Sequence, residues 1–340
     1  MLSPLAAIYG AAAAWRMARP GRAARIPVLC IGNLTLGGAG KTPAAIAVAQ
    51  ILHAAGRRPF VLSRGYGGAL AGPIQVDPAR HRSAEVGDEP LLLARFAPTI
   101  VARDRAAGAD AARAAGAGSI VMDDGFQSPG LQKDRSILVV DGRRGIGNGM
   151  VFPAGPLRAP LESQLRRAGA LLVIGAGAAG EAVAALARQL AQDLPVFRGR
   201  LEPDAQALAV LKGRPVLAFA GIGDPEKFFA TLRDAGIELG ATVSFPDHHR
   251  YRRYEARDLI ERAERDGLVP VTTEKDVARL YGQDDLAALA AVARPLPVML
   301  RVAETGAFED FVLSEPVAGA TAASPPPARR RAPEAPRSSI

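Results

Sequence analysis

Short apolar runs alternate with longer helix-like stretches through most of the chain. The apolar runs have the length of buried strands and are rich in Val, Ile and Leu. They predict strands at Pro27–Ile31, Pro59–Ser63, Thr99–Ala102, Ser119–Met122, Ser136–Asp141, Ala170–Ile174, Val216–Ala220, Glu238–Ser244 and Pro270–Thr273. The stretches between them predict helices, notably at Pro43–Ala55, Arg103–Ala115, Ala178–Asp193, Pro225–Ala235 and Tyr254–Asp266. Strands that alternate with helices predict an α/β fold with a mostly parallel sheet flanked by helices.

Changes in this pattern divide the chain into four parts. Residues 1–25 hold an apolar helix and a basic cluster, and residues 26–204 hold the first set of strands and helices. The pattern restarts near residue 205 with fewer strands, so 205–313 is predicted to form a smaller C-terminal α/β domain. Residues 314–340 are rich in Ala, Pro, Ser and Arg and predict a disordered tail, because they cannot bury enough apolar surface to offset ordering.

The positive charge of the chain is concentrated at its two ends. The formal net charge is +8, and the first 25 residues contribute four arginines without any acid. An arginine triplet lies in the C-terminal tail, where solvated charge is favoured over contact with lipid or nucleic acid. We therefore expect no nucleic-acid partner, and the sequence does not call for an obligate protein partner. The single cysteine, Cys30, excludes an internal disulfide and fits a reducing compartment.

The N-terminal segment combines apolar residues with the arginines that follow them. Leu5–Trp15 carries no charge. As a helix it would be about 16 Å long, roughly half the thickness of the hydrocarbon core, so it cannot cross a bilayer. A secretory signal would place its charges before the apolar run. The pattern is typical of a helix that lies on an anionic membrane surface, and a helix packed on the protein's own core is an equal alternative.

The stretch from Ile31 to Thr42 has the organisation of a phosphate-binding loop. An apolar strand precedes it and a helix-like run starting at Pro43 follows it. The candidate loop residues are Gly37, Gly38, Ala39, Gly40, Lys41 and Thr42. Glycines let backbone N–H groups surround an anion, the lysine reaches the β- and γ-phosphates, and the threonine ligates Mg²⁺. Thr35 stands where the strict pattern has glycine, and an ordinary turn is the alternative. The strand before the loop and the helix after it nevertheless predict a nucleoside triphosphate site.

Two pairs of carboxylates are candidates for metal binding and proton transfer. Asp123 and Asp124 directly follow an apolar strand, as in the Walker-B arrangement, where a carboxylate holds Mg²⁺ directly or through water. A simple turn is the alternative there. Asp88 and Glu89 lie in a loop bounded by Gly and Pro. That loop is either only a helix entry or the place of a base that accepts a proton from an attacking hydroxyl.

Three further segments carry candidate side chains. Arg64 lies in a glycine loop after a strand, which either brings a guanidinium to phosphate or is a surface turn. A rigid Pro/Gly segment presents Arg158. His248 and His249 are two of the four histidines, and no companion Cys or His motif accompanies them. Proton transfer beside Asp88 is therefore favoured over zinc binding for this pair.

Taken in order, these motifs resemble those of the tetraacyldisaccharide 4′-kinase family, the lipid A 4′-kinases of Gram-negative bacteria. The resemblance runs from about residue 1 to residue 313. Its segments are Gly32–Pro43, Leu62–Gly67, Gly87–Pro90, Asp123–Gln127, Pro153–Arg158, Phe219–Gly223, Phe245–His249 and Thr273–Asp276. Several short motifs in one order are more specific than a P-loop alone.

The resemblance implies a P-loop NTPase-type fold and a lipid kinase. The reaction would transfer the γ-phosphate of ATP, with Mg²⁺, to the 4′-hydroxyl of tetraacyldisaccharide 1-phosphate, an acylated glucosamine disaccharide 1-phosphate. The enzyme would work at the cytoplasmic face of the inner membrane, with its N-terminal helix in the lipid interface. By this resemblance, Lys41 and Thr42 would bind the nucleotide phosphates and Mg²⁺, and Asp123, Asp124 and Gln127 would organise the metal region. Asp88, paired with His248 and assisted by Glu89, would be the base. Arg64 and Arg158 are weaker candidates for contacts with phosphate or sugar.

One departure and two rival classes qualify this interpretation. The family usually has Glu after Pro-Leu-Arg, whereas Ala159 follows here, so Arg158 is expected to be held less firmly. A switch ATPase or GTPase is disfavoured because Leu36 stands where partition ATPases carry lysine and no Asn-Lys-x-Asp motif is present. A scaffold that has lost its chemistry is disfavoured because Lys41, Thr42 and Asp88 are retained.

Overall fold

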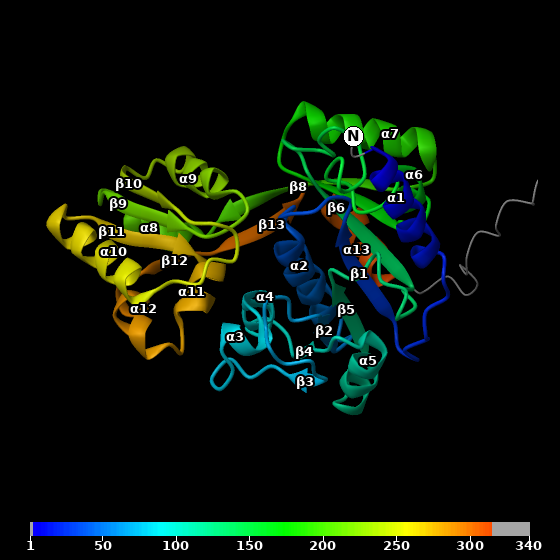
Figure 1. Cartoon of the computed structure of the whole chain (residues 1–340), viewed down its shortest axis with the longest axis horizontal. Coiled ribbons are helices and arrows are strands. Elements are labelled where there is room, and N and C mark those ends of the chain that lie inside the picture. The colour runs from blue at the N-terminus through cyan, green and yellow to red at the C-terminus, as the bar shows by residue number, and fades with distance from the viewer. Residues whose placement is uncertain (1–2, 315–340) are drawn as a thin grey trace, which may run out of the picture.

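The computed structural model describes residues 3–314, and the strands of this part form a nine-stranded and a four-stranded sheet (Figure 1). The larger sheet contains β1 (Val28–Asn33), β2 (Pro59–Ser63), β3 (Ile74–Gln75), β4 (Thr99–Val101), β5 (Ser119–Asp123), β6 (Arg135–Asp141), β7 (Ala170–Ile174), β8 (Val196–Pro203) and β13 (Val298–Val302). The smaller sheet contains β9 (Val216–Ala220), β10 (Leu239–Ser244), β11 (Val269–Thr273) and β12 (Arg294–Leu296).

The helices connect these strands and cover the sheets. They are α1 (Ser3–Met17), α2 (Lys41–Ala54), α3 (Ser83–Val86), α4 (Asp88–Leu93), α5 (Arg105–Ala114), α6 (Leu161–Leu165), α7 (Ala178–Leu190), α8 (Ala205–Leu211), α9 (Pro225–Asp234), α10 (Arg253–Arg265), α11 (Glu274–Leu280), α12 (Ala287–Val292) and α13 (Thr305–Leu313). A short 3₁₀ helix, η1 (Asp284–Leu286), precedes α12.

The larger sheet is parallel except at its edges. Its strand order is β13-β8-β7-β6-β1-β5-β2-β4-β3, and only the outermost β13 and β3 pair antiparallel with their neighbours. Strand β1 lies between β5 and β6, so the carboxyl ends of all three meet at one edge. Open parallel sheets bind their ligands at this edge, next to the strand where the chain reverses direction across the sheet.

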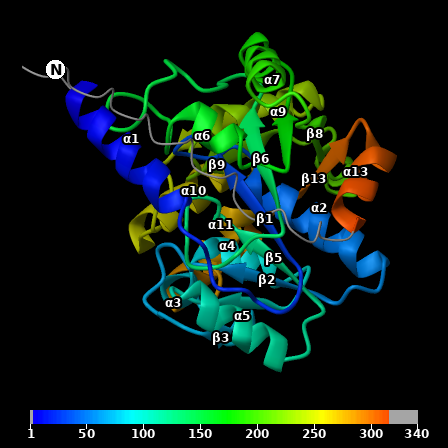
Figure 2. The same cartoon turned by 90° about the vertical axis from the view of Figure 1, so that its right-hand side faces the viewer.

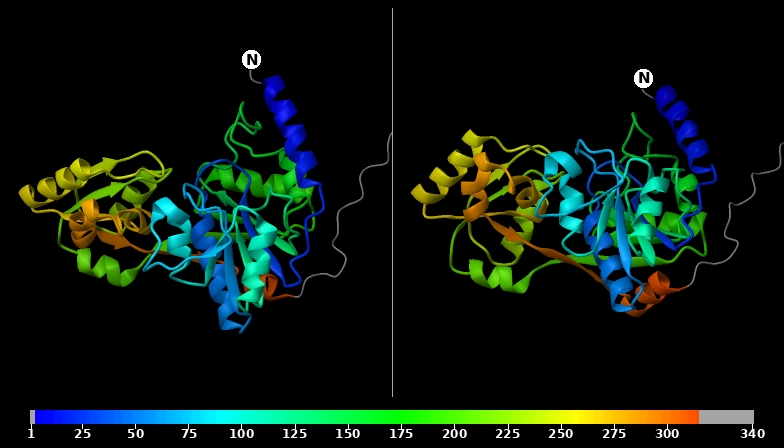
Figure 3. Two further views of the ribbon diagram at one scale, coloured as in Figure 1. Left: turned by 60° about the horizontal axis from the view of Figure 1, so that its bottom comes forward. Right: turned by 90° about the horizontal axis from the view of Figure 1, so that it is seen from below.

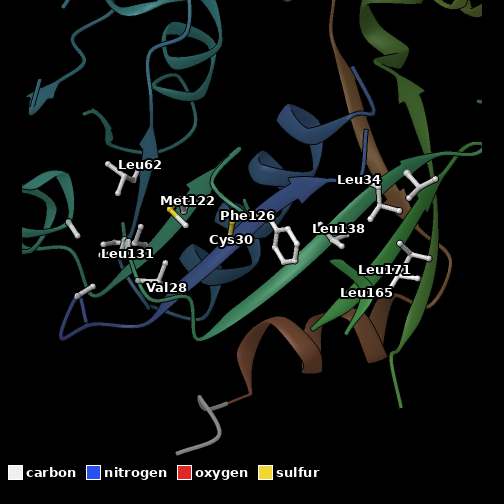
Figure 4. Packing of buried hydrophobic residues seen from close by; sticks show 14 of the residues in the cluster. Val28, Cys30, Leu34, Leu62, Met122, Phe126, Leu131, Leu138, Leu165 and Leu171 are labelled. Atoms are coloured by element: carbon white, nitrogen blue, oxygen red, sulfur yellow. The ribbon is translucent and has the colours of Figure 1, made fainter. Parts of the chain in front are cut away.

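Alternate residues of the central strands pack into separate cores on the two faces of the larger sheet, as the two-residue period of a strand requires. Cys30 and Met122 face a core that includes Phe126 and side chains from α5, α6 and α7 (Figure 4). Ile31 and Val121 face the opposite core, which is covered by α2, α4 and α13. In Figure 2, α2 and α13 lie together on one side of the sheet.

The smaller sheet is parallel throughout, in the order β10-β9-β11-β12, with α8 and α9 on one face and α10 to α12 on the other. Strands β8 and β13 pair antiparallel and lead the chain out to this second domain and back again, as Figure 3 shows. Residues 298–313 therefore rejoin the first sheet, whereas the sequence pattern predicted one C-terminal domain over 205–313. Only Pro297 separates β12, in the smaller sheet, from β13, in the larger sheet. So short an interruption gives no sign in the sequence that the chain passes from one sheet to the other.

Helix α1 packs on the larger domain along one face only. Ala6, Gly10 and Ala13 are buried, whereas Ile8 and Trp15 are exposed on the opposite side. The buried face fits the alternative of a helix packed on the protein's own core, and contact of the exposed face with a membrane surface stays a prediction. Among residues 3–314, no helix combines the length and apolar character that a bilayer span requires.

The predicted α/β fold with a mostly parallel sheet and a second, smaller sheet is confirmed. The nine predicted strands all form, and the structure adds the short β3 and β12 and the two connecting strands β8 and β13. The predicted tail, 314–340, lies outside the described residues apart from Ser314.

Candidate active site

A cleft of about 710 Å³ lies between the carboxyl edge of the larger sheet and the second domain. Its walls include most of the residues to which the sequence assigned chemistry. From the first domain these are 36–43, Arg64, Glu89, Asp123, Asp124 and Arg158, and from the second domain Ile222, Gly223, Asp247, His248 and 273–275. Asp224 and Lys227, to which the sequence assigned nothing, also line the cleft. The cleft is therefore the candidate active site.

The glycine-rich loop connects β1 to α2, as predicted. Gly40 adopts a left-handed conformation with φ of 90°, and a Cβ there would lie 2.9 Å from Ile174 Cδ1, so the position requires glycine. Lys41 begins α2, and its Nζ lies 3.8 Å from Asp124 Oδ2. The Thr42 hydroxyl is 3.5 Å from Glu89 Oε1. A glycine loop followed by the amino terminus of a helix is a suitable cradle for phosphate.

Asp123 and Asp124 form the acidic end of β5 beside this loop. Asp123 is only 2% exposed, and its Oδ1 has no hydrogen-bond partner in the described part of the chain. Burial and the nearby charges of Glu89 and Asp124 raise the pKa of Asp123 to about 7. A buried carboxylate oxygen without a partner, on the same cleft as the P-loop threonine, fits an oxygen-ligated Mg²⁺.

Arg158 is held firmly, contrary to the expectation from Ala159. Its Nη1 and Nη2 each lie 3.1 Å from an oxygen of Asp124, and its Nε donates to the Thr35 carbonyl at 3.0 Å. The two-point ion pair fixes the guanidinium against the cleft. The neighbouring Asp124 thus provides the carboxylate that the sequence lacks after Arg158.

Arg64 and Gln127 occupy different surroundings. Arg64 lines the cleft, as the glycine-loop interpretation expects. The Gln127 amide donates to the Asn33 carbonyl and to Gln164 Oε1, both at 2.9 Å, and Gln127 does not line the cleft. Gln127 therefore supports the strand–loop junction, and its role near the metal stays a prediction.

Asp88 and His248 come from different domains and meet at the cleft wall. Asp88 is the first residue of α4 and is 5% exposed, and its Oδ2 accepts a hydrogen bond from His248 Nδ1 at 3.3 Å. His248 lines the cleft and has a left-handed backbone with φ of 57°, a strained conformation common at functional sites. The Tyr66 ring lies 5.3 Å from the imidazole, centroid to centroid. The arrangement provides an oriented imidazole at the surface of the cleft.

The charges around this pair act in opposite directions on its two members. Burial acts to raise the pKa of Asp88, but the His248 hydrogen bond and the charge of Arg279 together hold it well below its ordinary value. The same hydrogen bond to Asp88 raises the pKa of His248, against the effect of burial. Asp88 is thus an ionised carboxylate at neutral pH, as a hydrogen-bond acceptor for His248 must be.

Two cations of α11 were not assigned a role from the sequence. Lys275 Nζ lies 2.5 Å from Glu89 Oε1, and Arg279 Nε donates to Asp88 Oδ2 at 2.7 Å. Both belong to one helix face, four residues apart, and both face the start of α4. The Thr-Glu-Lys-Asp motif contained Lys275, but the sequence alone gave no sign that its helix faces the Asp88–Glu89 pair.

Comparison with known proteins identifies the family. Residues 1–316 match the family described as tetraacyldisaccharide-1-P 4′-kinase. The chain belongs to this family. Relatives named tetraacyldisaccharide 4′-kinase include one from Methylobacterium sp. (strain 4-46), 60% identical over 88% of each chain, and one from Rhodopseudomonas palustris (strain BisA53), 55% identical over 93% of this chain and 92% of the relative.

A solved structure of a tetraacyldisaccharide 4′-kinase family member has the same fold. LpxK from Aquifex aeolicus, crystallised in complex with ATP, is 26% identical and superimposes with a TM-score of 0.71, covering 92% of this chain and 97% of that one. The prediction of an ATP-dependent tetraacyldisaccharide 4′-kinase, made from the ordered motifs, is therefore confirmed. The enzyme is a phosphotransferase of lipid A biosynthesis.

Proposed function

We propose that the cleft transfers the γ-phosphoryl group of ATP to the 4′-hydroxyl of tetraacyldisaccharide 1-phosphate through the Asp88–His248 pair. The observation that carries this proposal is that His248, hydrogen-bonded to Asp88 of the other domain, lines the same cleft as the phosphate loop. Phosphoryl transfer needs positioning and charge neutralisation more than covalent help from the protein.

In this proposal the loop residues bind the nucleotide phosphates. The backbone of Gly37, Gly38, Ala39 and Gly40 surrounds the phosphates, and Lys41 adds a positive charge at the β- and γ-groups. Thr42, Asp123 and Asp124 would hold Mg²⁺, with Gln127 near them. When bound, this cation neutralises charge on the phosphates. Arg64 and Arg158 are proposed to contact phosphate or sugar oxygens from the same side of the cleft.

The proton and phosphoryl steps balance as follows. The hydroxyl proton passes to the Asp88–His248 pair at His248 Nε2, while His248 Nδ1 stays hydrogen-bonded to the Asp88 carboxylate, and the 4′-oxygen forms a bond to the γ-phosphorus. The bond from that phosphorus to the bridging oxygen breaks, and its electron pair leaves with ADP. Glu89 assists by adding negative charge near Thr42 and by fixing Lys275. Burial acts to raise the pKa of Glu89, but the charge of Lys275 holds it below its ordinary value.

We propose further that the enzyme works on the cytoplasmic face of the inner membrane. Leu5, Ile8 and Trp15 are exposed along the outer face of α1, and the Arg19 guanidinium lies 4.1 Å from the Trp15 ring centre. In Figure 3, α1 projects from the first domain. An apolar face followed by arginines suits an anionic lipid surface, where an acylated acceptor resides.

The activity is tested by measuring transfer from γ-labelled ATP to tetraacyldisaccharide 1-phosphate in detergent micelles. We expect a labelled, more polar lipid that forms only when acceptor and Mg²⁺ are both present. Chelation with EDTA should abolish the product, and added Mg²⁺ should restore it, because the carboxylates at the phosphates would otherwise repel them. Release of inorganic phosphate at the same rate without acceptor would contradict the proposal and point to a switch ATPase.

The membrane interaction is tested on the exposed face of α1. The double variant Ile8→Asp/Trp15→Asp should bind anionic vesicles at least tenfold more weakly, because each apolar side chain contributes about 1.5–3 kcal/mol when it leaves water. Vesicle co-sedimentation measures this. Val210→Asp on α8 is a matched control, since Val210 is 59% exposed and Trp15 is 60% exposed. Equal vesicle binding by the double variant and the control would contradict a role for α1.

A further inference from the structure

Arg279 is a buried cation that none of the roles above uses. It is 4% exposed, and its Nε donates to Asp88 Oδ2 at 2.7 Å while Nη2 donates to the same oxygen. Its Nη1 points the other way and donates to the Gly221 carbonyl at 2.6 Å and to Asp276 Oδ1 at 2.8 Å. The guanidinium therefore connects a carboxylate of the first domain to backbone and side chain of the second.

The second domain fixes this guanidinium from behind. Asp276 is fully buried, and it accepts hydrogen bonds from the Tyr251 hydroxyl at 2.8 Å and from the Gly221 amide at 3.0 Å. The Gly221 carbonyl also accepts the backbone N–H of His248 at 3.1 Å. The same peptide segment thus holds Arg279 and the backbone of His248. Gly221 is suited to this place because a Cβ would lie 3.1 Å from Asp276 Oδ1 and 3.2 Å from Arg279 Nη1.

We infer that Arg279 is a positioning residue that holds the Asp88 carboxylate in the orientation in which it bonds to His248. This inference rests on the proposed function, in which Asp88 and His248 together accept the hydroxyl proton. The pair is contributed by α4 of the first domain and the 245–249 segment of the second. Arg279 bonds to Asp88 on one side and to Gly221, which holds the His248 backbone, on the other, and so fixes the two partners relative to each other.

The contacts of the Asp88 carboxylate explain why a guanidinium is needed. Its Oδ2 accepts from His248 and from two nitrogens of Arg279, and its Oδ1 accepts the backbone N–H of Glu89 at 3.0 Å. Both oxygens are therefore occupied and the plane of the carboxylate is set. A planar guanidinium reaches Asp88 and Gly221 at once, whereas the single ammonium of lysine cannot span both in fixed geometry. The positive charge also compensates two buried carboxylates, Asp88 and Asp276.

The test is Arg279→Lys, which retains the positive charge and removes the planar guanidinium that reaches Asp88 and Gly221 at once. We expect kcat for transfer to the lipid acceptor to fall about 10- to 100-fold, because small misplacements of a reacting group have effects of this size. The KM values for ATP and acceptor should change little. In Arg279→Ala, guanidinium ion at concentrations too low to unfold the protein should restore part of kcat. Arg253→Lys, at the exposed start of α10, is the matched control.

A double-mutant cycle with Asp88→Asn separates positioning from general support of the fold. If Arg279 acts through Asp88, Arg279→Lys should lower kcat no further once Asp88 is replaced. Kcat of Arg279→Lys equal to that of the control, or losses that multiply in the double variant, would overturn the inference. If Arg279→Ala does not fold, kcat of Arg279→Lys and the double-mutant cycle still test whether Arg279 acts through Asp88. An inactive Asp88→Asn beside an active Arg279→Lys refutes only this inference, whereas an active Asp88→Asn refutes the proposed base and this inference together.

Discussion

Replacement of Asp88 with asparagine is expected to lower kcat by about 10²–10⁴-fold, the contribution of a general base with its orienting partner. Asparagine keeps the size of the side chain but loses the charge that His248 and Arg279 contact on Oδ2. The imidazole then loses the partner that orients it and raises its pKa. Affinity for ATP should change little, because Asp88 lies behind the cleft wall and not in the phosphate loop.

The measurement is single-turnover transfer from γ-labelled ATP, combined with ATP titration of the same preparation. Loss of a buried counterion for Arg279 should also lower the free energy of unfolding by about 3 kcal/mol, so a thermal unfolding curve must accompany the kinetics. Asp193→Asn, at an exposed loop position, is the matched control. Transfer by the folded Asp88→Asn variant at the rate of this control would contradict the proposed role of Asp88.

The central part of the fold could be predicted because its signals are local. Each strand around the phosphate loop is a continuous apolar run, since both faces of a parallel sheet are covered by helices. β7 and β9 form at the predicted residues, and β1 and β5 extend only one or two residues beyond the predicted ends. The loop and the Asp123–Asp124 pair could be placed at one edge because both directly follow such strands.

The connecting strands were missed because their sequences do not have that pattern. β8, Val196–Pro203, includes charged residues and glycine, since it is only partly buried, and β13 lies at the sheet edge. Their pairing depends on contacts between residues a hundred positions apart, such as Arg200 with Arg301. The return of the chain to the first sheet could therefore not be read from local periodicity.

In the site, as in the fold, the residues in local motifs could be predicted and the contacts between distant residues could not. Asp88 and His248 were paired through the family resemblance, and their contact at 3.3 Å spans two domains. The partners of the acids on α4, Lys275 and Arg279, lie almost two hundred residues away in the sequence, and neither spacing nor composition connects them. Arg158 shows the reverse case, since the expected loss of its glutamate is compensated by Asp124, which only the folded chain brings near.

The second large effect is expected from Lys41→Met, which should lower kcat by about 10²–10³-fold. Lys41 begins α2, is nearly buried, and lies 3.8 Å from Asp124. In the proposed reaction its ammonium lies at the transferred phosphate, where negative charge spreads over the oxygens of the transition state. Methionine retains most of the volume and removes the charge, so the loop should keep its shape while two carboxylates, Asp123 and Asp124, lose a neighbouring cation.

This loss of charge gives the variant a second, distinguishing effect. Without Lys41, the carboxylates repel the nucleotide phosphates more strongly, so ATP affinity should fall along with kcat, unlike in Asp88→Asn. Titration with ATP at several Mg²⁺ concentrations measures the ATP affinity, and single-turnover transfer measures the fall in the rate of transfer. Lys212→Met replaces an exposed lysine of the second domain and serves as the control. A Lys41→Met enzyme that transfers phosphate within about tenfold of the control would mean that Lys41 does not act at the phosphates, because oxyanion-type stabilisation is larger than that.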